Sequence, residues 1–353
     1  MEHMQQLEHL IETVVKEGAS DLHLVHGYRP TVRVSGLLVP LVKEEVLSEE
    51  DSVGFMEALL SSENREFFLR DKEIDFSYAY RNEARFRGNC YYTRGGIGIA
   101  LRLIPRHIKT LEELNLPDAL RRFTELPQGF FLVVGPVGQG KSTTLAAMIE
   151  IVNTSRAEHI VTIEDPIEYL FEPQKSMIDQ REVRVDTADF HIALRQAFRQ
   201  DIDVLLIGEM RSPETISAAV TAAETGHLVF STLHTNNAAQ TIDRIIDSFP
   251  ASQQDQIRVQ LAGSLAGIFS QRLIPRISGG LVPAYELLVN NNAVSNLIRE
   301  RRTHEINTVI ETGLESGMVD MNRSLAELVR AGDVTVEEAR RHSLNPKVLE
   351  KML

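Results

Sequence analysis

The sequence predicts an α/β protein in which an N-terminal α+β domain precedes an α/β domain and a helical C-terminal region. Its 353 residues are enough for two domains that each bury a core. In the middle of the chain, nearly continuous apolar runs alternate with helical stretches, which is typical of a parallel sheet covered on both faces. Shorter β-type runs precede them. We expect domains at 1–104, 118–276 and 277–353, with a linker at 105–117.

The N-terminal domain is expected to begin with an amphipathic helix. Leu7, Leu10, Ile11 and Val14 recur at helical spacing, and Gly18 suits the position that ends the helix. Ser48 is the expected N-cap of a second helix. The expected strands of this domain lie at 21–25, 31–36, 74–80, 84–92 and 96–104.

The linker and the rest of the chain show further local signals. Thr110 and Glu113 have the spacing of a capping box, so we expect a short helix that Pro117 ends. From about Ile277 onward the chain is expected to be mostly helical, with Thr335 capping one helix and Asn345 opening the last. The expected buried strands between these regions lie at 130–134, 159–163, 203–208 and 227–233.

The composition of the chain weighs against several classes of protein. The net charge of −13 weighs against a protein that coats nucleic acid. The single cysteine, Cys90, excludes an intrachain disulfide framework and a four-cysteine zinc site, and it fits a reducing compartment. No apolar run approaches the roughly 18 residues of a membrane span, and the N-terminus lacks the pattern of a secretory signal. We therefore expect a soluble cytoplasmic protein.

A phosphate-binding loop follows the first buried strand. Gly135, Gly140, Lys141 and Ser142 satisfy the pattern G-x4-G-K-[ST], between a strand and a helix as that motif requires. Glycines allow backbone N–H groups to surround a phosphate, and the helix N-terminus adds a favourable dipole. Lys141 would reach the β- and γ-phosphates, and the Ser142 hydroxyl would bind Mg²⁺. The expected nucleotide-binding residues are Gly135, Pro136, Val137, Gly138, Gln139, Gly140, Lys141, Ser142 and Thr143.

Glu209 ends the buried strand 203–208 and suits the second metal-side position of such a site. Most strands of this kind end in aspartate, and glutamate is one methylene longer. A water-bridged contact to Mg²⁺ is therefore expected rather than direct ligation. The alternative is an acid that caps the next helix, but Ser212 and Pro213 already supply that cap.

Two histidines flank the next buried strand. Ligands of open parallel sheets bind beyond the carboxyl ends of the strands, so His234 is well placed and His227 is not. His234 could sense the γ-phosphate by donating a hydrogen bond, although a structural role remains its alternative.

The stretch "TIEDPIEYL", 162–170, places Glu164 at the carboxyl end of the strand that follows the P-loop helix. A hydrolase must orient and deprotonate water, and a carboxylate held by a proline-stiffened turn can do so. Glu164 is therefore the first choice as catalytic base. Asp165 and Glu168 are expected to shape the turn or bind arginine, or else to be merely solvated.

Together these residues resemble the secretion ATPase superfamily, and most closely its PilT family of type IV pilus retraction ATPases. The similarity covers nearly the whole chain and includes the stretches GASDLHL, ARFRGN, GPVGQGKSTTLAAMI, TIEDPIEYL, GEMRSPETISAAVTAAETGHLVFSTLHT and NLIRE. The resemblance implies a PAS-like N-terminal domain, a RecA-like ATPase domain and a homohexameric ring. It also implies that Glu164 is the catalytic base and Glu209 the Walker B acid. Val137 and Gln139 depart from the usual threonine and serine of the loop.

Hydrolysis also needs positive charge over the γ-phosphate. Residues 81–102 hold five arginines against one acid, Glu83, whereas Arg211 is the only arginine noted near the later strand ends. An arginine finger raises kcat by roughly 10³ to 10⁵, far more than a surface ion pair contributes. Arg85 and Arg102 are the preferred candidates, and a solvated basic strand face is the alternative.

The expected function is therefore that of a motor that hydrolyses ATP with Mg²⁺ and powers type IV pilus retraction. The resemblance implies partners in the inner-membrane pilus platform and pilin machinery, and a peripheral position at the inner face of the inner membrane. A pilus assembly or type II secretion ATPase is the alternative within the superfamily; such proteins usually carry an extra N-terminal domain and a tetracysteine insert. A RecA-like nucleic-acid motor is the alternative from another class, and no stable nucleic-acid binding is expected.

Overall fold

The computed structural model describes residues 2–34, 36–81, 84–104, 107–210 and 212–353. The chain forms two compact units. The N-terminal unit comprises Met1–His107 with Glu168–Leu170, and the C-terminal unit comprises Ile108–Ile167 with Phe171–Leu353. The expected start of the linker, 105–106, lies outside the described residues, as do Glu83 and Arg211.

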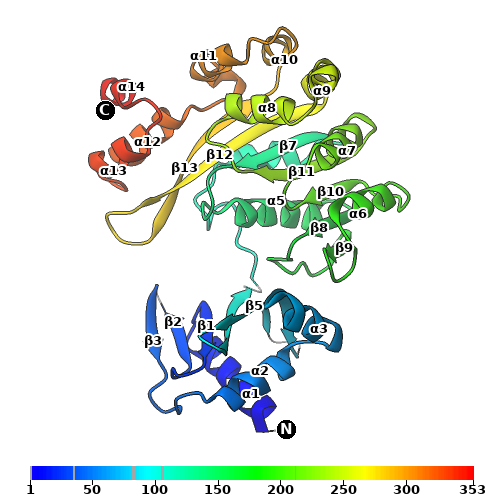
Figure 1. The fold of residues 1–353 in the computed structure, drawn as a ribbon. Helices are drawn as coiled ribbons and strands as arrows, with labels where there is room; N and C mark the ends of the chain where they lie inside the picture. Colours follow the sequence, from blue (N-terminus) through cyan, green and yellow to red (C-terminus); the bar gives the residue numbers. More distant parts are fainter. Residues whose placement is uncertain (1, 35, 82–83, 105–106, 211) are drawn as a thin grey trace. The chain divides into compact units, whose positions relative to one another are not determined.

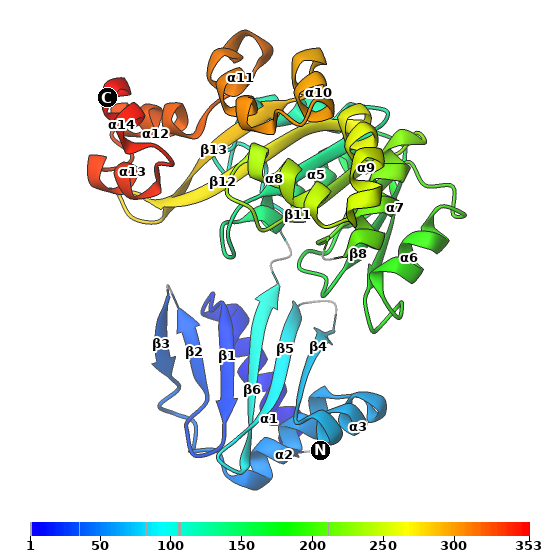
Figure 2. The ribbon, with the colours of Figure 1, turned by 45° about the horizontal axis from the view of Figure 1, so that its top comes forward.

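The N-terminal unit is built on a six-stranded antiparallel sheet of order β3-β2-β1-β6-β5-β4. Its elements are α1 (Glu2–Lys16), β1 (Asp21–Val25), β2 (Thr31–Val34), β3 (Leu37–Pro40), α2 (Glu49–Leu59), α3 (Ser62–Asp71), β4 (Glu73–Tyr80), β5 (Ala84–Thr93) and β6 (Gly96–Ile104). Helices α1 and α2 pack on one face of the sheet (Figure 2). Side chains alternate across a strand, so the odd-numbered residues of β5, beginning with Arg85, lie on the other face.

Most elements expected in this unit are confirmed. The first helix and the five expected strands are present, and Ser48 forms the capping box of α2 with Asp51. Strand β3 and helix α3 were not expected. Strand β3 lies at the sheet edge with all four side chains exposed, so it lacks the alternation of burial that marks a strand.

The C-terminal unit holds a seven-stranded sheet of order β13-β12-β7-β11-β10-β8-β9, in which only β13 runs antiparallel to its neighbour. Its strands are β7 (Gly129–Val134), β8 (His159–Glu164), β9 (Met177–Glu182), β10 (Val204–Ile207), β11 (Leu228–Leu233), β12 (Leu265–Pro275) and β13 (Leu281–Val289). Its helices are η1 (Asp118–Leu120), α4 (Arg121–Thr124), α5 (Lys141–Ser155), α6 (Phe190–Ala197), α7 (Pro213–Glu224), α8 (Ala238–Asp247), α9 (Ala251–Ser264), α10 (Asn292–Arg299), η2 (Thr303–Glu305), α11 (Ile306–Thr312), η3 (Leu314–Ser316), α12 (Met321–Arg330), α13 (Val336–His342) and α14 (Pro346–Met352).

Helices cover both faces of this sheet, with α5 on one side and α7, α8 and α9 on the other (Figure 1). The chain moves outward from β7 to β8 and then returns through β10 and β11 to β12. A right-handed crossover puts its helix on one face of the sheet when the chain moves one way across the strands, and on the other face when the chain moves back. Helix α5, which follows β7, and helix α8, which follows the neighbouring β11, therefore lie on opposite faces. In open α/β sheets ligands bind at the carboxyl ends of such a strand pair, so the carboxyl end of β7 lies at a ligand-binding point.

Several features of the C-terminal unit differ from the sequence-based expectation. Strands β9, β12 and β13 were not expected, and β13 adds sheet to a region read as mostly helical. In the linker, Thr110 and Glu113 exchange both capping-box hydrogen bonds, but the residues that follow form a turn instead of the expected helix. The expected caps at Ser212, Thr335 and Asn345 all begin helices.

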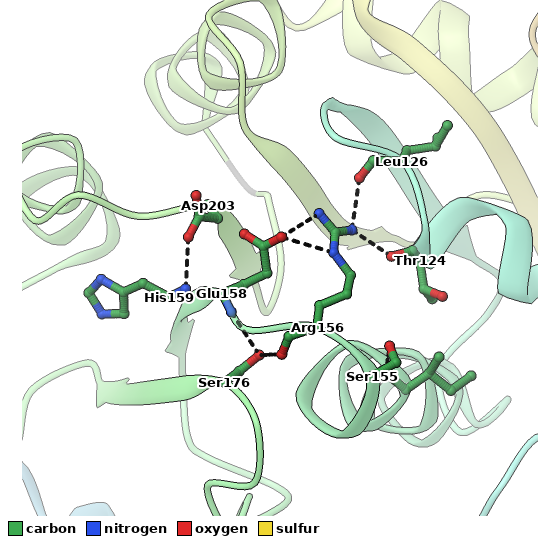
Figure 3. Close-up of polar contacts among 9 residues, drawn as sticks. Thr124, Leu126, Ser155, Arg156, Glu158, His159, Ser176 and Asp203 are labelled. Carbon is green, nitrogen blue, oxygen red and sulfur yellow. Dashed lines mark hydrogen bonds and ion pairs between the residues drawn. The ribbon is translucent and has the colours of Figure 1, made fainter.

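A polar network holds together the starts of the central strands (Figure 3). The Arg156 guanidinium donates to the carbonyl oxygens of Thr124 and Leu126, at 2.7 and 2.9 Å, and to the Glu158 carboxylate. The Asp203 carboxylate accepts from the N–H of His159 at 2.8 Å. These contacts join segments that precede β7, β8 and β10, so they stabilise the sheet edge opposite the carboxyl ends of those strands.

No helix within the described ranges is long and apolar enough to cross a membrane.

Glu286 is a buried carboxyl group in the middle of β13. It is 5% exposed, and its Oε1 accepts a hydrogen bond from the N–H of Ala238, the first residue of α8, at 2.8 Å. Burial raises the pKa of Glu286 to about 7, and the nearby Asp320 carboxylate adds to this rise. The folded chain therefore keeps a proton that the unfolded chain loses above its lower pKa, so the free energy of unfolding falls as pH rises toward 7.

Replacing Glu286 with glutamine should raise the thermal midpoint of unfolding at pH 8, by an amount equivalent to about 1–3 kcal/mol. The amide oxygen can still accept from Ala238, but it carries no charge that must be buried. The advantage should shrink toward pH 5, where the wild-type carboxyl is protonated. Midpoints at pH 5, 6.5 and 8, with the exposed Glu311→Gln as control, test this; parallel profiles for wild type and E286Q would contradict it.

Candidate nucleotide-binding site

The P-loop joins β7 to α5 and is confined by β12. Gly135 has φ +149°, and a Cβ there would lie 2.5 Å from the carbonyl oxygen of Gln271. Gly140 has φ +77° and immediately precedes α5. Both positions require glycine, the first for space and the second for a left-handed backbone. The loop therefore brings backbone N–H groups and the start of α5 to the carboxyl end of β7.

Lys141 stands at the mouth of this loop and is 7% exposed. Its ammonium donates to the carbonyl oxygens of Gly135 and Pro136 at 2.9 and 2.8 Å. It also lies 3.2 Å from Nδ1 of His234. An ammonium has donors only, so His234 Nδ1 accepts this bond and the proton of the neutral ring resides on Nε2.

Glu209 and His234 meet at the same edge of the sheet. Glu209 follows β10 and His234 follows β11, and His234 Nε2 lies 3.9 Å from the Glu209 carboxylate. The neighbouring Thr232 hydroxyl donates to the carbonyl of Gly208 at 2.7 Å, which ties the two strand ends together. The structure thus assembles Lys141, His234 and Glu209 from three different strand ends.

His227 occupies the opposite end of β11. Its Nδ1 lies 3.0 Å from the carbonyl oxygen of Ala222, and its ring packs near Phe198. The distinction drawn from the sequence between the two histidines is therefore confirmed.

Glu164 is the last residue of β8 and is 9% exposed. Its Oε1 accepts from the Thr162 hydroxyl at 2.6 Å and faces the amide of Gln180 at 3.4 Å. Gly208 lies beside it, because an added Cβ at that glycine would contact the Glu164 Cα at 3.4 Å. A positioned, nearly buried carboxylate at the carboxyl end of the strand can accept a proton from water.

The other two acids of the stretch 162–170 have different surroundings. Both carboxylate oxygens of Asp165 accept from Nη2 of Arg184, at 2.8 and 2.9 Å, which matches the expectation that Asp165 would bind arginine. Glu168 is assigned to the N-terminal unit.

The oxygen donors at this site are few, which fits a Mg²⁺ ion held chiefly by the phosphates of a nucleotide. No group of three or more histidine, cysteine, aspartate or glutamate side chains that could hold a metal occurs within the described ranges. Ser142, in the first turn of α5, and Glu209 supply a hydroxyl and a carboxylate. Mg²⁺ commonly takes one or two protein oxygens and completes its shell with phosphates and water, so this donor set fits.

The two candidate arginines lie on the helix-free face of the N-terminal sheet. Arg85 is on β5, and Arg102 on β6 pairs with Arg87 in the strand register. Arg102 donates to the Asp21 carboxylate at 2.9 Å, and its side chain is 69% exposed. Arg102 thus has a partner within its own unit.

Sequence reasoning missed three polar residues of the site. The Gln271 amide oxygen accepts from the Thr144 hydroxyl at 2.6 Å, directly beneath the P-loop. Gln180, on the unexpected strand β9, faces Glu164. Thr144 lies two residues after Ser142, so its closeness to the P-loop motif is a local signal that it belongs to the site. The two glutamines have no local signal, because only strand pairing brings β9 and β12 to the site.

Comparisons with known proteins agree with this geometry. The sequence pattern of the family described as type II/IV secretion system protein matches residues 2–341. The chain is 46% identical over 318 residues to a twitching motility protein of Neisseria gonorrhoeae, covering 90% of this chain and 84% of that one. It is 43% identical over 338 residues to the type IV pilus retraction ATPase PilT of Pseudomonas aeruginosa, covering 96% and 98%.

A solved structure of similar shape is described as the pilus retraction motor PilT with bound ADP. Its TM-score against this chain is 0.92 at 43% sequence identity, and the match covers 98% of each chain.

Proposed function

Because the chain belongs to the type II/IV secretion system protein family, we propose that it is an ATPase motor that powers type IV pilus retraction. The observation that carries the proposal is the assembly of Lys141, His234 and Glu209 at one sheet edge. This assembly occurs in a chain that matches a named retraction ATPase over nearly its full length. The family similarity and the polar site thus point to the same activity.

The domain assignment is part of the proposal. We assign a PAS-like fold to residues 1–104 and a RecA-like fold to residues 118–276, with a linker at 105–117 and a C-terminal region at 277–353 that contains β13 and is otherwise mostly helical. The parallel sheet with helices on both faces supports the second assignment. Strand β13 extends that sheet beyond residue 276, so the C-terminal helices would move with the ATPase core.

Each residue of the site has a proposed role with ATP. The backbone N–H groups available within residues 135–143, where Pro136 has none, surround the β-phosphate, and Lys141 exchanges its carbonyl acceptors for phosphate oxygens. Ser142 and Glu209 would hold Mg²⁺, the glutamate through a bridging water. The ion would neutralise charge on the phosphates. His234 can report the γ-phosphate because its ring already contacts both Lys141 and Glu209.

Water attack would be promoted by Glu164. Its position at the end of β8 and its hydrogen bond from Thr162 suit a carboxylate that orients water and removes a proton. Arg85 and Arg102 are proposed to supply positive charge in the transition state. We further propose a homohexamer at the cytoplasmic face of the inner membrane, with the pilus platform and pilin machinery as partners.

A complementation experiment tests the function. Deletion of the gene should leave cells piliated but unable to retract pili or to twitch, and the wild-type chain should restore both. Loss of piliation instead of retraction would favour an assembly ATPase. Stimulation of the purified ATPase by DNA would favour a nucleic-acid motor.

Replacing Lys141 with alanine should weaken ATP binding by about tenfold or more, because a charge-assisted hydrogen bond to phosphate contributes about 1.5–3 kcal/mol. The change also removes the contact to His234. Calorimetric titration with ATP and with ADP measures the effect on a variant checked for unchanged secondary structure. An unchanged dissociation constant would contradict the P-loop assignment.

A further inference from the structure

Strand β12 extends past the end of β7 and runs alongside the P-loop. Val134, the last residue of β7, pairs with Ser270, whereas β12 continues to Pro275. On the side that faces the loop, residues 271–275 therefore have no strand partner within the described part of the chain. Backbone N–H groups in such a place need another acceptor.

Gln139 supplies that acceptor from within the loop. Its side-chain Oε1 accepts a hydrogen bond from the N–H of Leu273 at 2.7 Å. On the other side of Lys141, the Thr144 hydroxyl donates to the Gln271 amide oxygen at 2.6 Å. The loop is thus attached to β12 on both sides of its lysine.

The same stretch of β12 holds the loop that carries His234. The Ser270 hydroxyl donates to the Asn236 carbonyl oxygen at 2.9 Å, and the Arg272 guanidinium donates to the Asn236 side chain at 3.3 Å. Just beyond, Ile274 packs with the C-terminal helices in one core that includes Leu325 and Leu349. Residues 270–274 therefore contact the P-loop, the His234 loop and the C-terminal helices in turn.

We propose that Gln139 is a positioning residue that pre-orders the P-loop against β12 and so sets the affinity for nucleotide without setting the rate of hydrolysis. The inference rests on the proposed ATP site. A loop held in its binding geometry before the ligand arrives binds more tightly, because the apparent dissociation constant scales inversely with the binding-competent fraction. The Gln139 side chain bonds to Leu273, whereas Ser270 and Arg272 make the contacts of β12 with the His234 loop, and Glu164 ends β8. Loss of the Gln139 side chain should therefore leave the hydrolytic step intact.

The test compares Gln139→Met and Gln139→Ser in the full chain. Methionine matches glutamine in length but has a poor acceptor, and serine is too short to reach Leu273. Both variants should raise the dissociation constants of ATP and ADP, and the KM for ATP, about 3- to 10-fold, the range of one net hydrogen bond. The kcat should stay within about twofold of wild type. The exposed Gln253→Met serves as control for the change in side-chain chemistry.

Hydrogen exchange supplies a readout that does not depend on activity. The Leu273 amide should exchange faster in both Gln139 variants and at the wild-type rate in the control. Unchanged dissociation constants despite a deprotected Leu273 amide would overturn the proposal, as would a fall in kcat at constant KM. Such failures leave the proposed ATP site standing, since that site is tested separately by Lys141→Ala.

Discussion

Replacing Glu164 with glutamine should lower kcat for ATP hydrolysis by at least about 100-fold, the usual contribution of a general base. Glutamine has the same size, and its amide oxygen can still accept from Thr162, so the local structure should persist. What it loses is the basic carboxylate that takes a proton from water. ATP binding should be unchanged, because the P-loop and Lys141 are untouched.

Steady-state hydrolysis and calorimetric ATP binding separate these effects. Asp165→Asn is the matched control: it neutralises the adjacent carboxylate, whose partner is Arg184. That change should alter kcat only slightly. If E164Q hydrolyses ATP at nearly the wild-type rate, the base is elsewhere, and Glu209 becomes the next candidate.

Loss of the proposed catalytic arginine should have a still larger effect, a fall in kcat of about 10³-fold or more. A factor of 10³ to 10⁵ corresponds to about 4–7 kcal/mol of transition-state stabilisation. Arg102 would have to release Asp21 to act in this way. Asp21 is buried whereas Arg102 is largely exposed, and the Asp21 carboxylate keeps the Ser20 hydroxyl as a donor at 2.7 Å. Losing one charged hydrogen bond costs about 1.5–3 kcal/mol, which is less than the transition-state gain.

Measuring kcat for Arg85→Gln and for Arg102→Gln in the full chain shows which of the two arginines takes this catalytic role. Arg33→Gln is the matched control, because Arg33 lies on β2 and faces the same Asp21 carboxylate at 3.8 Å. It should change kcat less than about twofold. If all three variants keep wild-type activity, the arginines are a solvated face and the proposed role is wrong.

A fragment from about residue 115 onward offers an independent test. It retains Lys141, Glu164, Glu209 and His234 but lacks every arginine of residues 81–102. Once shown to be folded, it should bind ATP and turn over about 10³-fold more slowly than the full chain. Equal turnover would exclude a catalytic contribution from the N-terminal unit.

The elements that were predicted well are those with strong local signals. The P-loop is a contiguous motif, and the strands before Glu164, Glu209 and His234 are buried on both faces, so their apolar runs are unmistakable. Helix caps are equally local, since Ser48 and Thr335 bond within four residues.

Two of the missed strands, β9 and β13, lack such signals, whereas the missed β12 is largely apolar and buried. β9 is largely polar, and β13 contains Pro283; both lie at the sheet edges, where a polar face or a missing N–H is tolerated. In the linker, the capping box formed without a helix, because the turn that follows Thr110 ends at Pro117 after too few residues.

By itself the sequence determined the chemical groups of the site and the edge where they meet, since carboxyl ends of neighbouring parallel strands must share one edge. It could not determine which of those groups touch. The contact of Lys141 with His234, and those of Gln139 and Thr144 with β12, join residues 93 to 134 positions apart. Only the order in which strands pair brings them together, and that order is decided by non-local packing that no local pattern encodes.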